Sequence, residues 1–282
     1  MKSAYKGKLA RINLSTREIK VEELDLELAK KFIGGRGLGT KILYDEGVAK
    51  VEPLSPDNKL LFMTGPMTAA KVPTSGRYMV VTKAPLNNMI ASSNSGGKWG
   101  AFLKNAGWDG LIVEGKADTL VYLHIEDDKI EILPAEAYKG MMSEELDDRL
   151  KEVHPGSSVL NIGPSGENLS LMAAVMNDKD RAAGRGGVGA VMGSKNLKAI
   201  VVNATAKYAD AFDEKKLQEA NLECLKKIKA NPVTSEGLPT YGTAVLVNII
   251  NNVGSLPTKN WQEAYFEEAD KFSGESMNDE IL

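Results

Sequence analysis

The stretch Asp180-Arg-Ala-Ala-Gly-Arg-Gly-Gly-Val-Gly-Ala-Val-Met-Gly-Ser-Lys-Asn196 combines five glycines with two arginines and one lysine, and it has almost no bulk before Val191. Glycine lets the backbone approach another group closely and adopts positive φ without strain. Arginine binds phosphate or carboxylate through a planar fork of N–H donors. The mixture predicts a cradle for an anionic cofactor. The alternative is a surface turn that needs several left-handed residues.

The overall composition excludes several classes of protein. The chain has 282 residues and a net charge of −3, which fits one or two domains and argues against nucleic acid as the main ligand. No apolar run approaches the ~20 residues of a membrane span. The first residues also lack the apolar core of a signal peptide, so we expect a cytoplasmic protein that does not bind membranes. The single cysteine, Cys224, excludes an internal disulfide and a cysteine-held metal cluster built by this chain alone.

The order of the hydrophobic patterns indicates an α+β domain followed by helices. Alternation of apolar and polar residues over positions 8–21 is typical of a hairpin, and further strand patterns follow it. After Asp213 the apolar residues recur at helical spacing and no strand pattern returns. We therefore expect an α+β domain over residues 1–207 and the truncated beginning of a helical domain over residues 208–282. Cys224 occupies a helical position and is interpreted as a buried apolar residue.

The strand-rich region contains an internal repeat. Each half shows a strand, a Gly-Pro pair, a second strand, a Gly-Gly loop, a short link and a final strand. The matching segments are Thr64-Gly65-Pro66 with Ile162-Gly163-Pro164, Gly96-Gly97 with Gly186-Gly187, and residues 100–113 with residues 189–202. The repeat predicts two related mixed or antiparallel sheets that form a saddle around a pseudo-twofold axis. The two Gly-Gly loops would then meet near that axis and present backbone N–H groups from both sides.

Several familiar motifs do not fit. Gly184-x-Gly186-x-x-Gly189 has the spacing of the dinucleotide fingerprint, but we expect a strand rather than a long helix after it, and residues 203–209 contain no acid. Gly193-Ser-Lys195 lacks the upstream glycine of a Walker A loop. His124 and His154 are interpreted as isolated from each other and structural.

Three segments remain as a candidate site. Arginines would pair with phosphate oxygens, while glycine N–H groups would form an anion-binding nest. The Asn94 side-chain oxygen could hold Mg²⁺ between two phosphates, or Asn94 could be a loop residue that bonds its own backbone. Arg36 is a weaker anion-site candidate, because it could equally belong to a helix end followed by a new helix. The predicted cofactor-binding residues are Arg77, Asn94, Ser95, Gly96, Arg181, Ala182, Gly184 and Arg185.

These residues lie in runs that resemble the N-terminal domain of the aldehyde ferredoxin oxidoreductase family, the tungsten- or molybdenum-pterin enzymes. The similarity extends through nearly the whole chain. It is carried by Arg11-Ile-Asn-Leu-Ser15, Pro53-Leu-Ser-Pro-Asp57, Gly76-Arg77-Tyr78, Asn94-Ser-Gly-Gly97, Val113-Glu-Gly-Lys-Ala117, Gly163-Pro-Ser-Gly-Glu-Asn168, Arg181–Ile200 and Tyr241–Ile250.

The resemblance implies two pyranopterin dithiolenes that hold one tungsten or molybdenum, with a magnesium ion bridging their phosphates. The implied pterin contacts are Arg77, Asn94, Gly96, Arg181, Ala182, Gly184 and Arg185, with Asn94 and Ala182 next to the magnesium. The family oxidises an aldehyde with water to a carboxylic acid and passes the electrons through a [4Fe–4S] cluster to ferredoxin. The chemistry belongs to the cofactor, while the protein supplies position and electrostatics.

The family's cluster cysteines and acid/base residues follow the position where this sequence stops, so no catalytic residue is predicted in it. We expect the chain alone to be inactive and to need the missing helical domains, or a separate subunit that carries them. Apolar surface on the helix at 243–253 would favour a homo-oligomer. Two alternatives stay open: a non-catalytic subunit that binds pterin or docks to another chain, and a phosphate- or nucleotide-binding protein without metal.

Overall fold

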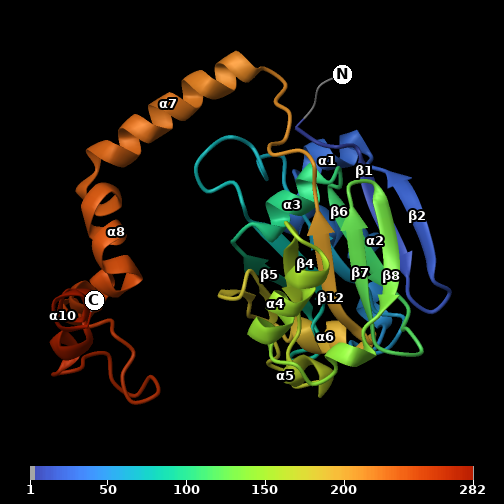
Figure 1. Cartoon of the computed structure of the whole chain (residues 1–282). Helices are drawn as coiled ribbons and strands as arrows, with labels where there is room; N and C mark the ends of the chain where they lie inside the picture. Colours follow the sequence, from blue (N-terminus) through green and yellow to red (C-terminus); the bar gives the residue numbers. More distant parts are fainter. Residues whose placement is uncertain (1–3, 282) are drawn as a thin grey trace. The chain divides into compact units, whose positions relative to one another are not determined.

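The computed structural model describes residues 4–281, and the chain forms two compact units (Figure 1). The first unit ends at Glu214 and the second begins at Lys215. The expected domain boundary, between residues 207 and 208, lies in the segment that connects the last strand of the first unit to the next helix. No helix among residues 4–281 is both long and apolar enough to cross a membrane.

The first unit contains two mixed sheets of six strands each. Sheet A has the strand order β2-β1-β6-β3-β4-β5, and only its β1–β6 pair is parallel. Its strands are β1 (Lys8–Asn13), β2 (Glu18–Glu23), β3 (Leu60–Met63), β4 (Tyr78–Lys83), β5 (Ile90–Ser95) and β6 (Gly110–Glu114).

Sheet B repeats this arrangement. Its strands are β7 (Val121–Glu126), β8 (Lys129–Pro134), β9 (Ser158–Asn161), β10 (Val175–Asn177), β11 (Arg181–Ala183) and β12 (Leu197–Asn203). Read as β8-β7-β12-β9-β10-β11, the order and the single parallel pair match sheet A strand for strand. The predicted α+β class with two related mixed sheets is therefore confirmed.

Each half also inserts a short helix before its last strand, namely α3 (Trp99–Asn105) and α6 (Val188–Ser194). The expectation that the glycine loop leads directly to a strand was wrong, because that loop opens α6. The rejection of a dinucleotide fold still holds, since β11 and β12 are separated by two strands and run antiparallel to each other.

The helix starts correct the glycine pairing of the repeat. Gly97 and Gly186 each lie two residues before their helix and have φ of +80° and +78°. They are therefore the equivalent positions, and the predicted match of Gly96-Gly97 with Gly186-Gly187 is shifted by one residue.

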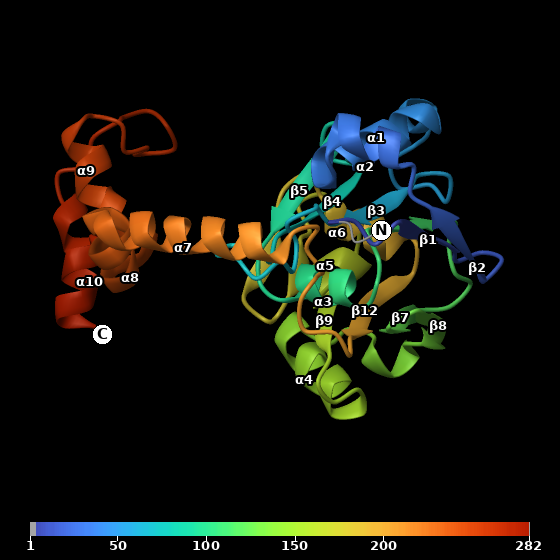
Figure 2. The same ribbon diagram turned by 90° about the horizontal axis from the view of Figure 1, so that it is seen from above.

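Alternate residues of the central strands pack into different cores. In β3, Leu60 and Phe62 face the core between the sheets, whereas Leu61 and Met63 pack with the helices on the outer face. The helices α1 (Leu26–Phe32) and α2 (Gly35–Asp45) and the 3-10 helix η1 (Val48–Lys50) cover sheet A, and α4 (Ser143–Val153) covers sheet B (Figure 2). The remaining short helices of this unit are η2 (Glu136–Tyr138) and α5 (Pro164–Glu167). Burial on both faces explains why central strands such as β3 and β6 read as continuous apolar runs.

Trp99 links the two halves inside the central core. Its ring packs against Phe62 and Tyr78, with centroids 5.6 and 4.7 Å apart. Its indole N–H donates to the Ile200 carbonyl of sheet B at 3.1 Å. Helix α3 of one half is thereby attached to β12, the last strand of the other half.

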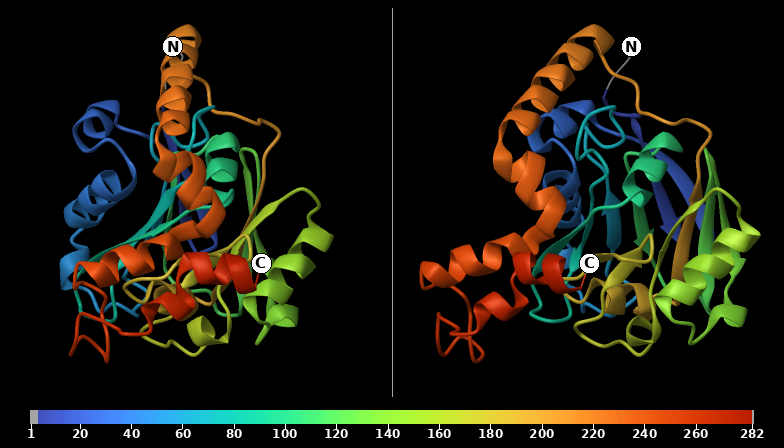
Figure 3. Two further views of the ribbon diagram at one scale, coloured as in Figure 1. Left: turned by 90° about the vertical axis from the view of Figure 1, so that its left-hand side faces the viewer. Right: turned by 60° about the vertical axis from the view of Figure 1, so that its left-hand side comes forward.

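The second unit is built from helices (Figure 3). They are α7 (Glu214–Ala230), the π-helix η3 (Val233–Gly237), α8 (Leu238–Tyr241), η4 (Gly242–Val245), α9 (Leu246–Asn252), η5 (Ala269–Phe272) and α10 (Gly274–Glu280). Helix α7 has no buried residue, and Cys224 on it is exposed, so its interpretation as a buried residue was wrong. Periodicity places a residue on a helix face but does not show whether that face is covered.

A charged cluster attaches the N-terminal hairpin to the rest of sheet A. The Arg11 guanidinium bonds Glu22 at 2.6 Å, Glu46 at 2.7 Å and Glu114 at 3.1 Å. Burial favours the neutral form of Glu46, but hydrogen bonds from Arg11 and Lys59 favour the ionised form more strongly, so the pKa of Glu46 is lowered. Glu46 therefore adds to the stability of this cluster only while its carboxylate is ionised.

We expect Glu46→Gln to lower the free energy of unfolding by about 1 kcal/mol at neutral pH. A lowered folded-state pKa means that this contribution is complete above the unfolded value of 4.5 and is lost as the pH falls through the folded value. Urea unfolding at neutral pH and at several values below pH 4.5 measures the difference from the parent. Glu18→Gln, at an exposed ion pair with Lys20, is the control with little effect. A difference that does not shrink on acidification would contradict the assignment.

Candidate cofactor site

The predicted site residues come together where the two sheets meet. β5 is an edge strand of sheet A, β11 is an edge strand of sheet B, and the two strands lie against each other. We call this junction the seam. The Arg185 N–H donates to Ser93 Oγ at 3.0 Å across it. The predicted residues lie beside the start of β4 and at or just beyond the ends of β5 and β11. The predicted meeting of the two Gly-Gly loops was wrong, because Gly97 contacts Asp178 and Arg181 at one end of the seam, while Gly186 contacts Ala91 at the other end.

Alternation along β5 separates two kinds of side chain. Ser93 and Ser95 are buried, whereas Asn94 between them is only half-buried. Ser95 Oγ donates to Asn177 Oδ1 at 2.6 Å, so the side chain of this predicted residue points into the protein. Only the backbone of Ser95 can contact a ligand at the surface.

The outward residues form one surface. Asn94 accepts a hydrogen bond from Arg77 through Oδ1, and its Nδ2 lies 3.5 Å from the Met79 sulfur, so its side chain does not bond its own backbone. We call this surface the cofactor seat. It consists of Arg77, Asn94, Gly96, Arg181, Ala182, Gly184 and Arg185, and all except half-buried Asn94 and Gly96 are exposed.

The arginines of the seat are available to an external anion. Within residues 4–281, no carboxylate lies within ion-pair distance of Arg77 or Arg185. Arg181 is 58% exposed, and its Nε is 3.9 Å from the Asp180 carboxylate, which is a weak pair. Three guanidinium groups with spare donors on one surface favour a ligand with more than one phosphate or carboxylate group.

The glycines at the seam fall into two classes. A methyl group at Gly97 would overlap the carboxylate of Asp178, and a methyl group at Gly187 would overlap the Leu171 carbonyl. These two glycines let chain segments approach each other. At Gly96 and Gly184, by contrast, an added methyl group would meet no other atom within 4 Å. No other atom covers the Cα atoms of these two glycines, which we therefore call bare, and a ligand can approach the backbone there.

Arg36 lies beside this surface in the first turn of α2, exposed to solvent. A methyl group on the preceding Gly35 would lie 3.3 Å from Met79, and Met79 pairs with Asn94 in the sheet. The structure therefore places the weaker sequence candidate at the border of the seat.

The lysine at the end of the glycine stretch has a structural role. Lys195 is completely buried, and its ammonium donates to the carbonyls of Pro56 at 3.3 Å, of Gly115 at 3.1 Å and of Asn58. Burial lowers the pKa of Lys195 to about 8. It cannot reach a phosphate at the surface, which agrees with the rejection of a Walker A loop.

The two histidines are not isolated, which corrects the sequence interpretation. Their rings stack with centroids 3.9 Å apart. Tyr122 Oη lies 3.1 Å from His154 Nε2, and His124 Nε2 lies 3.2 Å from Asn203 Oδ1. Burial, followed by the nearby His124, lowers the pKa of His154. The described residues include no group of three or more side chains that could hold a metal through histidine, cysteine, aspartate or glutamate.

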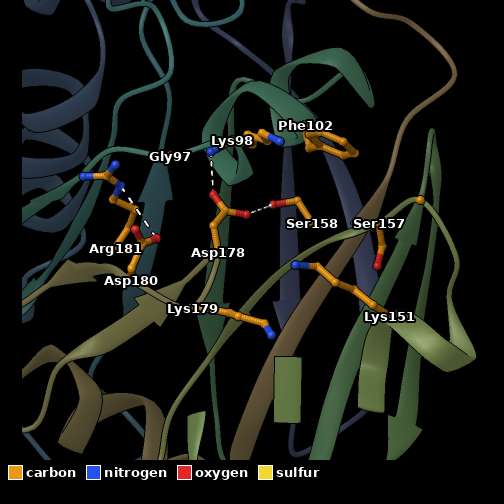
Figure 4. Close-up of a pocket in the computed structure, with 11 residues that line it drawn as sticks. Gly97, Lys98, Phe102, Lys151, Ser157, Ser158, Asp178, Lys179, Asp180 and Arg181 are labelled. Carbon is orange, nitrogen blue, oxygen red and sulfur yellow. Dashed lines mark hydrogen bonds and ion pairs between the residues drawn. The ribbon is translucent and has the colours of Figure 1, made fainter. Parts of the chain in front are cut away.

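Sequence reasoning missed the residues behind the seat. A pocket of about 530 Å³ lies beside Arg181 (Figure 4). In it Asp178 accepts hydrogen bonds from the Lys98 backbone N–H and from Ser158 Oγ, the latter at 2.8 Å. Asp178 follows Asn177, and the only signal in the sequence was this polar pair directly after a short apolar strand.

The fold and the site define a duplicated two-sheet domain with three exposed arginines and two bare glycines at the seam between its sheets. Residues 9–204 match the sequence profile of the aldehyde ferredoxin oxidoreductase N-terminal domain, and residues 219–282 match that of domains 2 and 3 of the same family. The chain belongs to the aldehyde ferredoxin oxidoreductase family.

Individual relatives agree with this assignment. The chain is 53% identical over 275 residues to the tungsten-containing aldehyde ferredoxin oxidoreductase of Pyrococcus abyssi, a match that covers 97% of this chain and 45% of the relative. It is 37% identical over 280 residues to the WOR-like subunit of an aliphatic sulfonate oxidoreductase of Pyrococcus furiosus, covering 93% and 44%. Among solved structures, the active-site complex BamBC of benzoyl coenzyme A reductase matches with a TM-score of 0.83 and 30% identity, covering 99% and 44%. The chain thus spans less than half the length of these relatives.

We expect Gly97→Ala to destabilise the protein by about 3 kcal/mol, because it combines a left-handed backbone with overlap on Asp178. Gly96→Ala is the matched control, because its methyl group points into open space and φ is not left-handed. It should change stability by less than about 0.5 kcal/mol. Chemical unfolding of both variants measures the contrast, and equal losses would show that the two glycines do not differ in role.

Proposed function

We propose that this chain supplies the metallopterin-binding part of an oxidoreductase that converts aldehydes to carboxylic acids. The observation that carries the proposal is the cofactor seat, where three arginines with unused N–H donors lie near the bare glycines at the seam. Family membership and 53% identity to a tungsten-containing aldehyde ferredoxin oxidoreductase support it.

The residues present fit a pair of phosphate-bearing pterins. Arg77 would hold phosphate from the side of sheet A, and Arg181 and Arg185 would do so from sheet B. The Asn94 oxygen has a second lone pair beside the one used by Arg77, which suits a magnesium ion. Ala182 lies on an edge strand, where backbone groups on the outer side have no ladder partner. We therefore retain Asn94 and Ala182 as the magnesium contacts.

The bound cofactor, with tungsten or molybdenum held by the pterin sulfurs, would supply the redox chemistry. The chain's own contribution is to bind and orient it. The arginines neutralise the phosphates, the glycine peptides donate backbone N–H groups, and the sheets behind them keep this surface rigid. No side chain of the seat is assigned as a proton donor or acceptor for the substrate.

The remaining parts of the reaction belong to the whole protein in this proposal. They are a [4Fe–4S] cluster, ferredoxin as the electron acceptor, and further helical domains or a separate subunit that carries them. We also keep two further predictions, that the protein forms a homo-oligomer and that it is cytoplasmic. The structural match to benzoyl coenzyme A reductase favours a second candidate, in which the same seat serves a non-aldehyde substrate. The higher identity to aldehyde enzymes places aldehydes first.

The first test is the cofactor content of the full-length protein that contains this chain, produced without oxygen and with tungstate. We expect tungsten by mass spectrometry and pterin by fluorescence after oxidation, with two pterins for each metal. A folded protein that contains neither tungsten nor pterin would contradict the proposal. Binding of nucleotides in their place would favour the phosphate-binding alternative, and pterin without oxidoreductase activity would favour the non-catalytic one.

The second test removes the guanidinium groups one at a time. Arg77→Ala, Arg181→Ala and Arg185→Ala should each lower the metal and pterin content of the folded full-length protein by about tenfold, because each loses a charge-assisted bond to phosphate. The melting temperature should hardly change, since these side chains are exposed. Arg149→Ala, at an exposed arginine on α4, is the control that keeps full content. Unchanged content in all three variants would refute the assignment.

A further inference from the structure

We propose that Asn177 is a positioning residue that holds the two halves of the cofactor seat in register. The inference rests on the proposed function to the extent that the seat is taken to bind a metallopterin. Asn177 makes no contact with the outer surface, because it is fully buried beneath the seam at the end of β10.

The amide of Asn177 connects one sheet to the other. Its Oδ1 accepts from the Tyr78 hydroxyl at 2.9 Å and from Ser95 Oγ at 2.6 Å. Its Nδ2 donates to the Gly96 carbonyl and to the Asp178 carboxylate, both at 3.0 Å. Two acceptor and two donor positions are thus filled. Three of these bonds cross from sheet B to sheet A.

Asp178 extends the connection to α3. Besides the Asn177 amide, it accepts from the Lys98 backbone N–H and from Ser158 Oγ. Asp178 and Lys179 have φ of +50° and +67°, a left-handed conformation that is strained for residues other than glycine. The hydrogen bonds to Asp178 hold this strained turn in place, and Arg181 follows it directly in β11.

The bonds determine how the arginines of the seat are spaced. Arg77 precedes Tyr78, and Asn94 precedes Ser95, so both move with the sheet A side of the network. Arg181 belongs to the hairpin that Asn177 and Asp178 form, and it moves with sheet B. A ligand with two phosphates requires both sides at a fixed separation, and Asn177 is the side chain that bonds to both.

Only an amide fits this position. An apolar residue would leave Tyr78, Ser95 and Gly96 without their partner, each at a cost that exceeds the value of one made hydrogen bond. Aspartate has the same shape but would place a second carboxylate against Asp178 and the Gly96 carbonyl. Burial raises the pKa of Tyr78, so its hydroxyl stays a donor.

Hydrogen exchange on the 282-residue chain tests the positioning directly, whether or not a cofactor is bound. In Asn177→Asp and Asn177→Ala, amides of residues 93–98 and 181–187 should both exchange about tenfold faster than in the parent. Tyr78→Phe removes one donor with little change in packing, and it should shift both segments in the same direction if the stronger variants do not fold. An unchanged rate in either segment overturns the proposal.

Asn58→Ala is the matched control. Asn58 is another fully buried amide, and it donates to Pro53 and to Thr82 and Lys83 of β4, with no hydrogen bond to β5, β10 or β11. It should speed exchange near those residues only, and faster exchange of both seat segments in this variant would overturn the specific role of Asn177.

Cofactor content of the full-length protein gives the second readout. Asn177→Asp should lower tungsten and pterin per folded molecule at least about fivefold, whereas Asn58→Ala should keep them. Content equal to the parent in Asn177→Asp overturns the positioning role toward the cofactor. If the parent itself contains neither metal nor pterin, the proposed function fails, while the exchange rates still decide whether Asn177 sets the register.

Discussion

Two edge strands from different sheets lie against each other at the seam without forming a backbone ladder. Edge strands carry unpaired N–H and C=O groups, and these groups need partners from side chains, water or a ligand. On the buried side of the seam the partners are side chains, as where Ser93 accepts from the Arg185 N–H and Asn177 donates to the Gly96 carbonyl. On the open side no other atom covers the Cα atoms of Gly96 and Gly184. The rest of the first unit, with both sheets covered on their outer faces, keeps these two edges in contact.

The repeat gives the two halves the same framework but different chemistry. Each half brings a glycine with positive φ two residues before its short helix, at Gly97 and Gly186. The residues just before these glycines differ, because one half offers Asn94 and the other offers Arg181 and Arg185. The sheet A side of the seat can therefore supply a neutral oxygen beside Arg77, while the sheet B side supplies two further positive charges, a combination that two identical loops could not provide.

The sequence predicted the two sheets, and it picked out residues that the fold brings together at the seam, because both depend on local patterns. Apolar runs ending at Gly-Pro pairs indicate buried strands, and arginine between glycines predicts an anion site. What it missed depends on tertiary contacts. Helix α6 is short and rich in glycine and valine, so its helical period was hidden, and the stacking of His124 on His154 needs sheet B to place β7 beside the end of α4. Cys224 was assigned to a core that does not cover α7. Ser95 was counted as a ligand contact because its position in the strand alternation, which turns it inward, could not be known from the loop sequence.

The bare glycines at positions 96 and 184 affect how the sequence of this domain can change in evolution. Contacts made by main-chain N–H groups do not depend on which side chains surround them, provided that the backbone path and the bare glycines persist. Mutations elsewhere in the domain can then accumulate without loss of the proposed cofactor contacts. Relatives named for aldehydes, for aliphatic sulfonates and for benzoyl coenzyme A match this chain at 53%, 37% and 30% identity. The backbone of such a domain can be conserved while the parts of the protein around it diverge toward new substrates.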